Sequence, residues 1–446
     1  MKYAGMNAIA CLIALCASAG PALARDIFPY PIETRVLPNG LKVVMVPFDS
    51  PGIVAYYSVV RAGSRNEVEP GLSGFAHFFE HMMFRGTERY STDDYNKLFK
   101  ELGSDANAFT TDDYTCYEAI LGNEGLEKVI EAESDRFMNL KYSVSDFQQE
   151  SRAVLGEYYK NYSRPNSKLY EKLRDTAFTS HTYKHTTMGF LKDIEDMPNQ
   201  YDYSLKFFDR FYQPGNVVVL IVGDFDPDRV MELIEKYYGK WEAKTYDLLV
   251  PVEPEQTSKR TAHIDWENPT LPYLAIAFHT PAFSTKNTDS AGLDILSELI
   301  FGRNSPLYQK LVIEDQSAES IRCSIPDKRD PGLFTIISRV KSDDLVEEVK
   351  NEIYEAIAEA REKPVDPKKL KAIKSRIRYS FAMRLDTAGS IARSLAHYLN
   401  LTGDPNSLNE IYKRYGEVSP GDLQRLAERY LVKHNCTEVT LIGVKN

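Results

Sequence analysis

The chain has 446 residues, 43% of them hydrophobic, which is enough to bury two sizeable cores. Its formal net charge of −10 argues against a basic surface for binding nucleic acid. Only three cysteines, Cys116, Cys323 and Cys436, follow the first 24 residues, so a disulfide scaffold is excluded and at most one disulfide is possible.

The first 24 residues have the pattern of a secretory signal peptide. A short basic start is followed by an apolar run over residues 8–19 and by the A-x-A cleavage site Ala22-Leu23-Ala24. Cleavage after Ala24 predicts export to the periplasm, with secretion from the cell as the second choice. No later apolar run reaches the length that spans a bilayer, so we expect no stable membrane span.

Three strands are expected before the first candidate site. Residues 34–46 indicate a β-hairpin, because the strong turn signal Asn39-Gly40 separates two strand-like runs. A third strand is predicted over residues 54–60 and leads into an apolar helix over residues 74–84. We expect Ser73 to cap the start of this helix and Gly86 to end it.

This helix carries the sequence His77-Phe78-Phe79-Glu80-His81. At 3.6 residues per turn the two histidines lie about 40° apart on one face, where both rings can bind one metal ion. Glu80 lies about 60° from His77 on the other side, within reach of a metal-activated water. This H-x-x-E-H spacing is the inverzincin signature. The alternative is a core helix, but burying these three polar residues is costly unless they pair or bind something.

A second predicted helix, residues 146–159 with Ser145 as its cap, supplies two candidates for a third ligand. Glu150 and Glu157 are two helical turns apart and therefore share one face. A catalytic zinc site needs three protein ligands and an open position, and an outer carboxylate often orients a ligating histidine. Spacing alone leaves open which glutamate takes which role, and whether both are solvated surface acids.

The rest of the first half mixes strands and helices. Strands are expected around Asn107 and over residues 115–121 and 217–223, and helices over residues 93–102, 126–140 and 226–238. This mixture predicts the α+β class, with an antiparallel-rich sheet packed against helices. Residues 244–264 contain Pro251, Pro254 and several polar residues, which indicates a linker between an N-terminal domain, residues 25–243, and a C-terminal domain, residues 265–446.

The second half repeats the order of elements weakly. Strands are predicted over residues 274–278, 333–340 and 438–443, and helices over residues 288–301 and 345–361. Aligning Gly292 with Gly74 puts Ile295 and Leu299 at the two histidine positions, whereas Glu298 matches Glu80. We therefore expect a second domain of similar fold without a metal site.

Other histidines are weaker candidates. His181 and His185 have the spacing of a metal pair, but the residues between them indicate a loop rather than a helix. The remaining histidines are isolated in the sequence. We expect surface or satisfied polar roles for them.

His77, Glu80, His81 and Glu157 together resemble the motif of the pitrilysin/insulinase family of zinc metallopeptidases, and residues 107–112 and 181–183 also match that family. The resemblance implies one Zn²⁺ per chain, held by His77, His81 and Glu157. It implies that Glu150 is an outer partner of the site and that Glu80 is the general base.

The resemblance also implies a fold and a substrate. Family members form clamshell chambers, of which this chain would be one half. A peptide substrate adds as an extra strand to the edge formed here by Asn107, Ala108 and Phe109. We expect a zinc-dependent endopeptidase that hydrolyses extended or unfolded peptides.

The second half departs from the family pattern at two positions. Where a substrate-binding arginine and tyrosine are expected, the chain has Val312 and Glu319. We therefore expect a heterodimer with a homologous subunit that lacks the zinc site and supplies the arginine and tyrosine. The alternative function is a non-catalytic scaffold or a metal-binding subunit of a complex.

Overall fold

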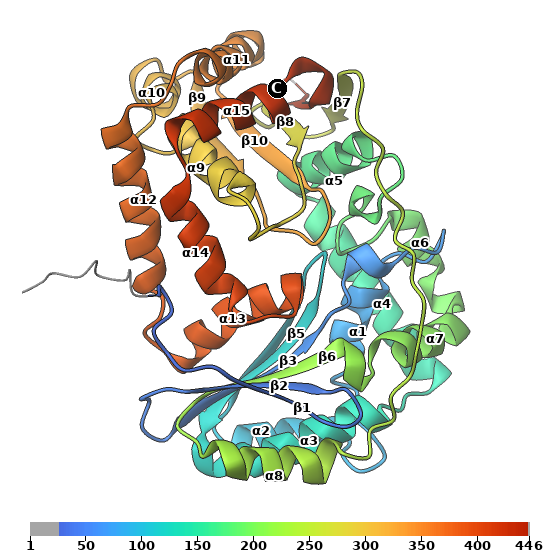
Figure 1. The fold of residues 1–446 in the computed structure, drawn as a ribbon. Helices are drawn as coiled ribbons and strands as arrows, with labels where there is room; N and C mark the ends of the chain where they lie inside the picture. Colours follow the sequence, from blue (N-terminus) through green and yellow to red (C-terminus); the bar gives the residue numbers. More distant parts are fainter. Residues whose placement is uncertain (1–25, 445–446) are drawn as a thin grey trace, which may run out of the picture.

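The computed structural model describes residues 26–444, so the expected signal peptide lies outside the described residues. Two β-sheets, each packed against helices, form the two halves of the molecule (Figure 1). The predicted α+β class is confirmed. No helix within residues 26–444 combines the length and apolar character needed to cross a membrane.

The first sheet has six strands in the order β1-β2-β6-β3-β5-β4. All neighbouring pairs are antiparallel except β2 and β6. The strands are β1 Glu33–Val36, β2 Lys42–Pro47, β3 Ile53–Val60, β4 Asp105–Thr110, β5 Thr115–Gly122 and β6 Val217–Gly223. The predicted hairpin is β1 and β2, and Gly40 at its turn has a φ of 90°, which favours glycine.

The second sheet has five strands in the order β7-β11-β8-β10-β9 and repeats the pairing of the first. Its single parallel pair is β7 with β11. The strands are β7 Arg260–Trp266, β8 Tyr273–His279, β9 Ala318–Ser324, β10 Leu333–Val340 and β11 Cys436–Gly443. The expected linker ended at residue 264, which is wrong because residues 260–264 already belong to β7.

The helices of the first half are α1 Phe75–Met82, α2 Thr92–Glu101, α3 Leu126–Asn139, α4 Val144–Tyr162, α5 Pro165–Ala177, α6 Leu191–Asp196, α7 Tyr201–Phe211 and α8 Pro227–Tyr238. Those of the second half are α9 Asp289–Phe301, α10 Pro306–Tyr308, α11 Val346–Glu362, α12 Pro367–Ala382, α13 Ala388–Thr402, α14 Ser407–Glu417 and α15 Pro420–Tyr430. In each half the first α-helix, α1 or α9, follows a strand inside its sheet, β3 or β8.

The two halves exchange a helix. Leu169, Leu173 and Ala177 of α5, in the first half of the chain, pack on the second sheet. Conversely, apolar residues of α13 such as Leu395 pack on the first sheet, where Val59 of β3 lies in the same core. In Figure 1, α13 lies over one face of the first sheet, and α2, α3 and α8 lie over the other. Each sheet is therefore completed by a helix from the opposite half.

The segment between α8 and β7 runs along one side of the molecule from the lower half to the upper half (Figure 1). Glu253 in this segment accepts hydrogen bonds from the backbone N–H groups of Thr179, Ser180 and His181. Gln256 donates to the carbonyl of Cys436 at 2.7 Å. These bonds tie the segment to both halves.

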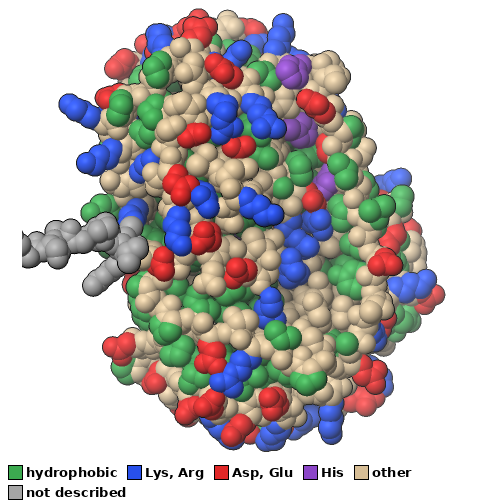
Figure 2. All heavy atoms as spheres, in the orientation of Figure 1, with side chains coloured by type: hydrophobic (Ala, Val, Ile, Leu, Met, Phe, Trp, Pro, Cys, Tyr) green, Lys and Arg blue, Asp and Glu red, His purple; other side chains and the backbone are tan. Residues whose placement is uncertain are grey.

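Acidic and basic side chains are interspersed over the face drawn in Figure 2. Cys116, Cys323 and Cys436 are unpaired in residues 26–444. Cys116 and Cys436 are buried, and burial raises the pKa of the Cys436 thiol to about 11. Neither thiol is poised for reaction at neutral pH.

Candidate metal centre

Helix α1 is fixed by aromatic packing. Phe78 contacts Phe147 of α4 with ring centroids 5.0 Å apart, and Phe79 stacks on Phe207 of α7 at 5.3 Å. Phe78 and Phe79 are fully buried. This packing fixes the rotation of α1 about its axis and so holds His77 and His81 on the face that looks toward Glu157 of α4.

The start of α1 is held differently from the expectation. The expected cap Ser73 donates its hydroxyl hydrogen to Asp193 at 2.6 Å instead. The N–H groups of Gly74 and Ala76 donate to the buried carboxylate of Glu67, each at 2.7 Å. The prediction of Ser73 as cap is therefore wrong, because a carboxylate seven residues from Gly74 satisfies the free donors of the first turn.

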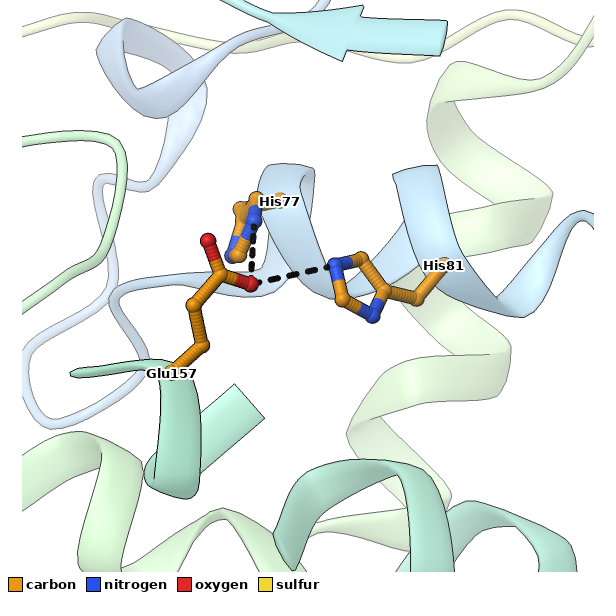
Figure 3. A group of neighbouring side chains, drawn as sticks. All are labelled: His77, His81 and Glu157. Carbon is orange, nitrogen blue, oxygen red and sulfur yellow. Dashed lines mark ion pairs between the residues drawn. The ribbon is translucent and has the colours of Figure 1, made fainter. Parts of the chain in front are cut away.

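Three side chains of the predicted site come together. His77 Nε2 lies 3.6 Å and His81 Nε2 lies 3.5 Å from Glu157 Oε2. Figure 3 shows both rings, carried by α1, pointing toward this carboxylate on α4. Their ligand atoms all lie within 4.8 Å of one another, and this is the one such group of three or more found in residues 26–444.

The donor set fits a zinc ion. Two imidazole nitrogens and one carboxylate oxygen are ordinary zinc ligands, and ligands about 2.0 Å from a tetrahedral ion lie roughly 3.3 Å apart. The two histidine–carboxylate separations, 3.6 and 3.5 Å, are close to that value. Lone pairs of unprotonated rings and of a carboxylate repel at this distance, so the arrangement is favourable with a cation between them.

The pKa values of the two rings shift in opposite directions. Burial, followed by the nearby His81, lowers the pKa of His77 to about 4, so its ring is neutral at physiological pH. The hydrogen bond to Glu150 raises the pKa of His81 above its ordinary value, against the effect of burial. A proton therefore competes with a metal at His81 more than at His77.

Glu150 lies on the far side of His81 from Glu157. Its Oε1 accepts a hydrogen bond from His81 Nδ1 at 2.9 Å, which leaves Nε2 of that ring free to face Glu157. Its Oε2 accepts from Arg85 Nε at 2.7 Å. The hydrogen bonds from His81 and Arg85 lower the pKa of Glu150 even though burial alone would raise it.

Arg85 was not identified from the sequence as a partner of the site, although it follows His81 by four residues, a spacing that places two side chains on one helix face.

The start of the second site helix was also predicted at the wrong residue. Helix α4 begins at Val144 and is capped by Ser143, whose hydroxyl accepts from the N–H of Asp146. Ser145, the expected cap, lies inside the helix.

Glu80 lies on the other flank of the histidine pair. Its Oε2 accepts a hydrogen bond from the hydroxyl of Thr110, on β4, at 2.6 Å. Burial raises the pKa of Glu80, and the Thr110 bond opposes that rise. An open depression of about 390 Å³ is lined by Glu80, His81, Asn107, Ala108 and Glu150, among others. This depression gives a ligand access to Glu80 and the ring of His81.

Strand β4 is an edge of the first sheet, because it pairs only with β5. Its unpaired side carries free backbone N–H and C=O groups. Asn107 and Ala108 line the depression beside Glu80. Phe109 does not, since its ring packs against Tyr114 and lies beneath the guanidinium group of Arg393, 4.9 Å away.

The remaining histidine candidates have other partners. His181 Nε2 contacts Asp330 at 3.0 Å, and its Nδ1 accepts from the N–H of Tyr183. His185 Nδ1 lies 2.9 Å from the carbonyl of Thr186. In the second half, Ile295 and Leu299 are buried in its apolar core.

Two family profiles match the chain. "Insulinase (Peptidase family M16)" matches residues 50–190, and "Peptidase M16 inactive domain" matches residues 200–377. The zinc protease PqqE of Helicobacter pylori is 28% identical over 415 residues, which covers 92% of each chain. The probable mitochondrial-processing peptidase subunit beta of Arabidopsis thaliana is 25% identical over 419 residues, covering 90% of this chain and 76% of the plant protein.

Solved structures share the fold. A protease from Helicobacter pylori has a TM-score of 0.87 at 28% identity, covering 93% of this chain and 99% of that chain. The periplasmic protease PqqL of Escherichia coli has a TM-score of 0.74 at 19% identity, covering 93% of this chain and 48% of that chain.

Proposed function

Because the chain belongs to the M16 (insulinase) family of peptidases, we propose that it is a zinc-dependent endopeptidase that hydrolyses extended or unfolded peptides. The observation that carries the proposal is the convergence of His77, His81 and Glu157 beside the carboxylate of Glu80. The three converging residues would hold the ion. Glu150 would hold the ring of His81 in the tautomer that leaves Nε2 free.

When bound, the zinc ion supplies a Lewis acid that polarises the scissile carbonyl and acidifies a water. Glu80 accepts the proton of the attacking water and delivers it to the leaving amine. The raised pKa of Glu80 suits this exchange, since a catalytic acid–base group works best near the ambient pH. The hydrogen bond from Thr110 orients the carboxylate for the transfer.

The substrate peptide would pair with the free edge of β4. Asn107 and Ala108 would fix its backbone through main-chain hydrogen bonds, which accept many sequences but require an extended chain. Phe109 would contribute backbone groups only, because its side chain contacts Arg393 and Tyr114. This mode of binding favours unfolded peptides over folded proteins.

The test is a Glu80→Gln variant. It should keep its zinc but lose most turnover of an unstructured, internally quenched peptide, because an amide cannot take the proton of the water. Elemental analysis before and after dialysis against a chelator measures the metal, and Arg361→Gln, an exposed change on α11, is the control. Near-normal cleavage by the zinc-loaded Glu80→Gln variant would refute the assignment of Glu80.

We also propose that the chain works with a homologous subunit. Val312 packs against the core of the second half, and Glu319 forms an ion pair with Arg339 at 2.7 Å, so neither offers a group to a peptide bound elsewhere. A partner without zinc ligands, but with an arginine and a tyrosine at these positions, would complete one clamshell chamber. The purified chain alone should bind zinc and cleave poorly. Full activity from a preparation with no second polypeptide on a denaturing gel would refute the heterodimer.

The location proposed for the protein is the periplasm, and it rests on the predicted signal peptide. Mass spectrometry of the N-terminus after fractionation tests it, since cleavage after Ala24 is the expected result. A scaffold role is the competing function. As a scaffold the chain should not hold zinc, whereas as a metal-binding subunit it should hold zinc without hydrolysing peptides even when the partner is present.

A further inference from the structure

The second sheet is only partly covered on the side that faces α5. Apolar residues of α5 pack over β7, β11 and β8. Toward the edge of the sheet, where β10 pairs with β9, a cavity of about 440 Å³ opens between the strands and α5. Tyr170, Phe178 and Tyr273 supply aromatic wall to this cavity, which we call the edge cavity.

The register of the two strands sets the floor of the edge cavity. Thr335 pairs with Ser324, Ile337 with Arg322 and Arg339 with Ser320. All six residues line the cavity, so the same face of both strands is exposed there. This part of the sheet face therefore carries hydroxyl and guanidinium groups, whereas the part under α5 is apolar.

The charge of the edge cavity is positive. Arg174, Arg322, Lys328 and Arg339 line it, and no aspartate or glutamate does. Arg174 and Lys328 share the carboxylate of Asp112. Arg339 pairs with Glu319, as described above, and Arg322 has no anionic partner in residues 26–444.

Burial lowers the pKa of Lys328 to about 7, so that side chain does not add a full charge. Even with Lys328 uncharged, three guanidinium groups face two carboxylates. Arg174 is 4% exposed, and its two Nη atoms lie 2.9 and 3.2 Å from the two oxygens of Asp112, so its guanidinium group is already paired. Arg322 is the guanidinium group left over, and an additional anion is the ligand that would pair with it.

A continuous set of residues joins the edge cavity to the metal centre. A second hollow of about 400 Å³ is lined by Asn161 and Thr111 and shares Asn166, Tyr170 and Arg174 with the edge cavity. Asn161 Nδ2 lies 3.4 Å from Glu157 Oε1. One extended peptide could therefore occupy the metal centre and the edge cavity together.

We propose that the edge cavity binds a carboxylate of the peptide substrate, held by Arg322 and flanked by the aromatic wall. The proposal rests on the proposed function, because it assigns a substrate class to the same enzyme. Planar guanidinium groups match a planar carboxylate in two-point hydrogen bonds. The carboxylate can be the C-terminus of the peptide or an acidic side chain, and the experiment separates these sources.

The experiment measures binding without turnover. Zinc-loaded Glu80→Gln protein is titrated with four versions of one labelled, otherwise neutral peptide, which differ in a free or amidated C-terminus and in Glu or Gln at one interior position. We expect at least one carboxylate to tighten binding by about tenfold, the effect of a charged hydrogen bond. Adding Arg322→Gln should abolish this preference, and Arg322→Glu should reverse it. Adding Arg361→Gln, which lies outside the cavity, should leave it unchanged.

A preference that follows the free C-terminus, or one that follows the Glu side chain, supports the proposal and identifies the source. Equal binding of all four peptides overturns it, as does a preference that survives Arg322→Gln or is lost equally in Arg361→Gln. Cleavage of the neutral amidated peptide by the unmodified chain with its partner tests the proposed function separately. Carboxylate-dependent binding without any cleavage would support the binding site in the edge cavity and refute the peptidase activity. Cleavage with equal binding of all four peptides would support the peptidase activity and refute the binding site.

Discussion

Glu150 and Glu157 face the same histidine from opposite sides, and this difference predicts different losses on substitution. Glu157→Gln removes a direct ligand and should abolish stable zinc binding. In Glu150→Gln the amide oxygen can still accept from His81 Nδ1, but the negative charge that makes the ring more basic is lost. Loss of such an outer partner costs about 10–100-fold in affinity, or about 1.4–2.7 kcal/mol.

The structure places the expected loss for Glu150 near the upper end of that range. Its side chain is only 8% exposed, and it also accepts from Arg85, so the change leaves a cation without its anionic partner. One effect acts in the opposite direction. Glu150 is the main cause of the raised pKa of His81, so the variant also weakens the competing proton.

The assay is therefore a zinc titration against a chelator of known affinity at several pH values. In the unmodified chain, apparent affinity should fall as the pH drops through the raised pKa of His81. In Glu150→Gln this fall should begin at lower pH, and the loss of affinity should be largest in alkaline solution. The opposite ranking, with Glu157→Gln retaining more zinc than Glu150→Gln, would exchange the two roles and refute the reasoning.

Two further substitutions test the supports of α1. Glu67→Ala leaves the N–H groups of Gly74 and Ala76 without acceptors. The free energy of unfolding, measured by denaturant titration, should therefore fall by at least about 2 kcal/mol. An unchanged free energy would contradict these two hydrogen bonds. Thr110→Val removes the hydrogen bond that lowers the pKa of Glu80. The acid limb of the kcat/KM profile should therefore move to higher pH. An unmoved limb would show that Thr110 does not affect the pKa of Glu80.

Features set by near neighbours in the sequence were predictable. The hairpin at Gly40, the helix with its histidine pair, and β10 at residues 333–340 follow from turn residues and periodicity. The convergence of Glu157 with His77 depends instead on how α4 packs against α1, which no local pattern sets. Identifying it as the candidate third ligand also needed the family resemblance, since spacing treats Glu150 and Glu157 alike.

Features set by distant partners were not predictable. Strand β7 follows a proline-containing segment and is half exposed, and its partner β11 lies at the other end of the chain. Ser73 has the better local signal for a helix cap, but its hydroxyl donates to Asp193. Glu67 instead accepts the hydrogen bond from the N–H of Gly74 at the start of the helix. In both cases a long-range contact decides between locally similar alternatives.

The exchange of α5 and α13 also lies beyond the reach of the sequence, and it predicts how the chain unfolds. If each sheet needs a helix from the opposite half, neither half keeps its core when the other opens. Leu173 of α5 is fully buried against the second sheet, so Leu173→Ala should cost about 2–5 kcal/mol. The matched change Leu395→Ala, in α13 on the first sheet, should cost a similar amount. Both should shift one calorimetric transition whose calorimetric and van't Hoff enthalpies agree. Two resolved transitions, of which each variant moves only one, would show that the halves are independent and that the exchanged helices do not couple them.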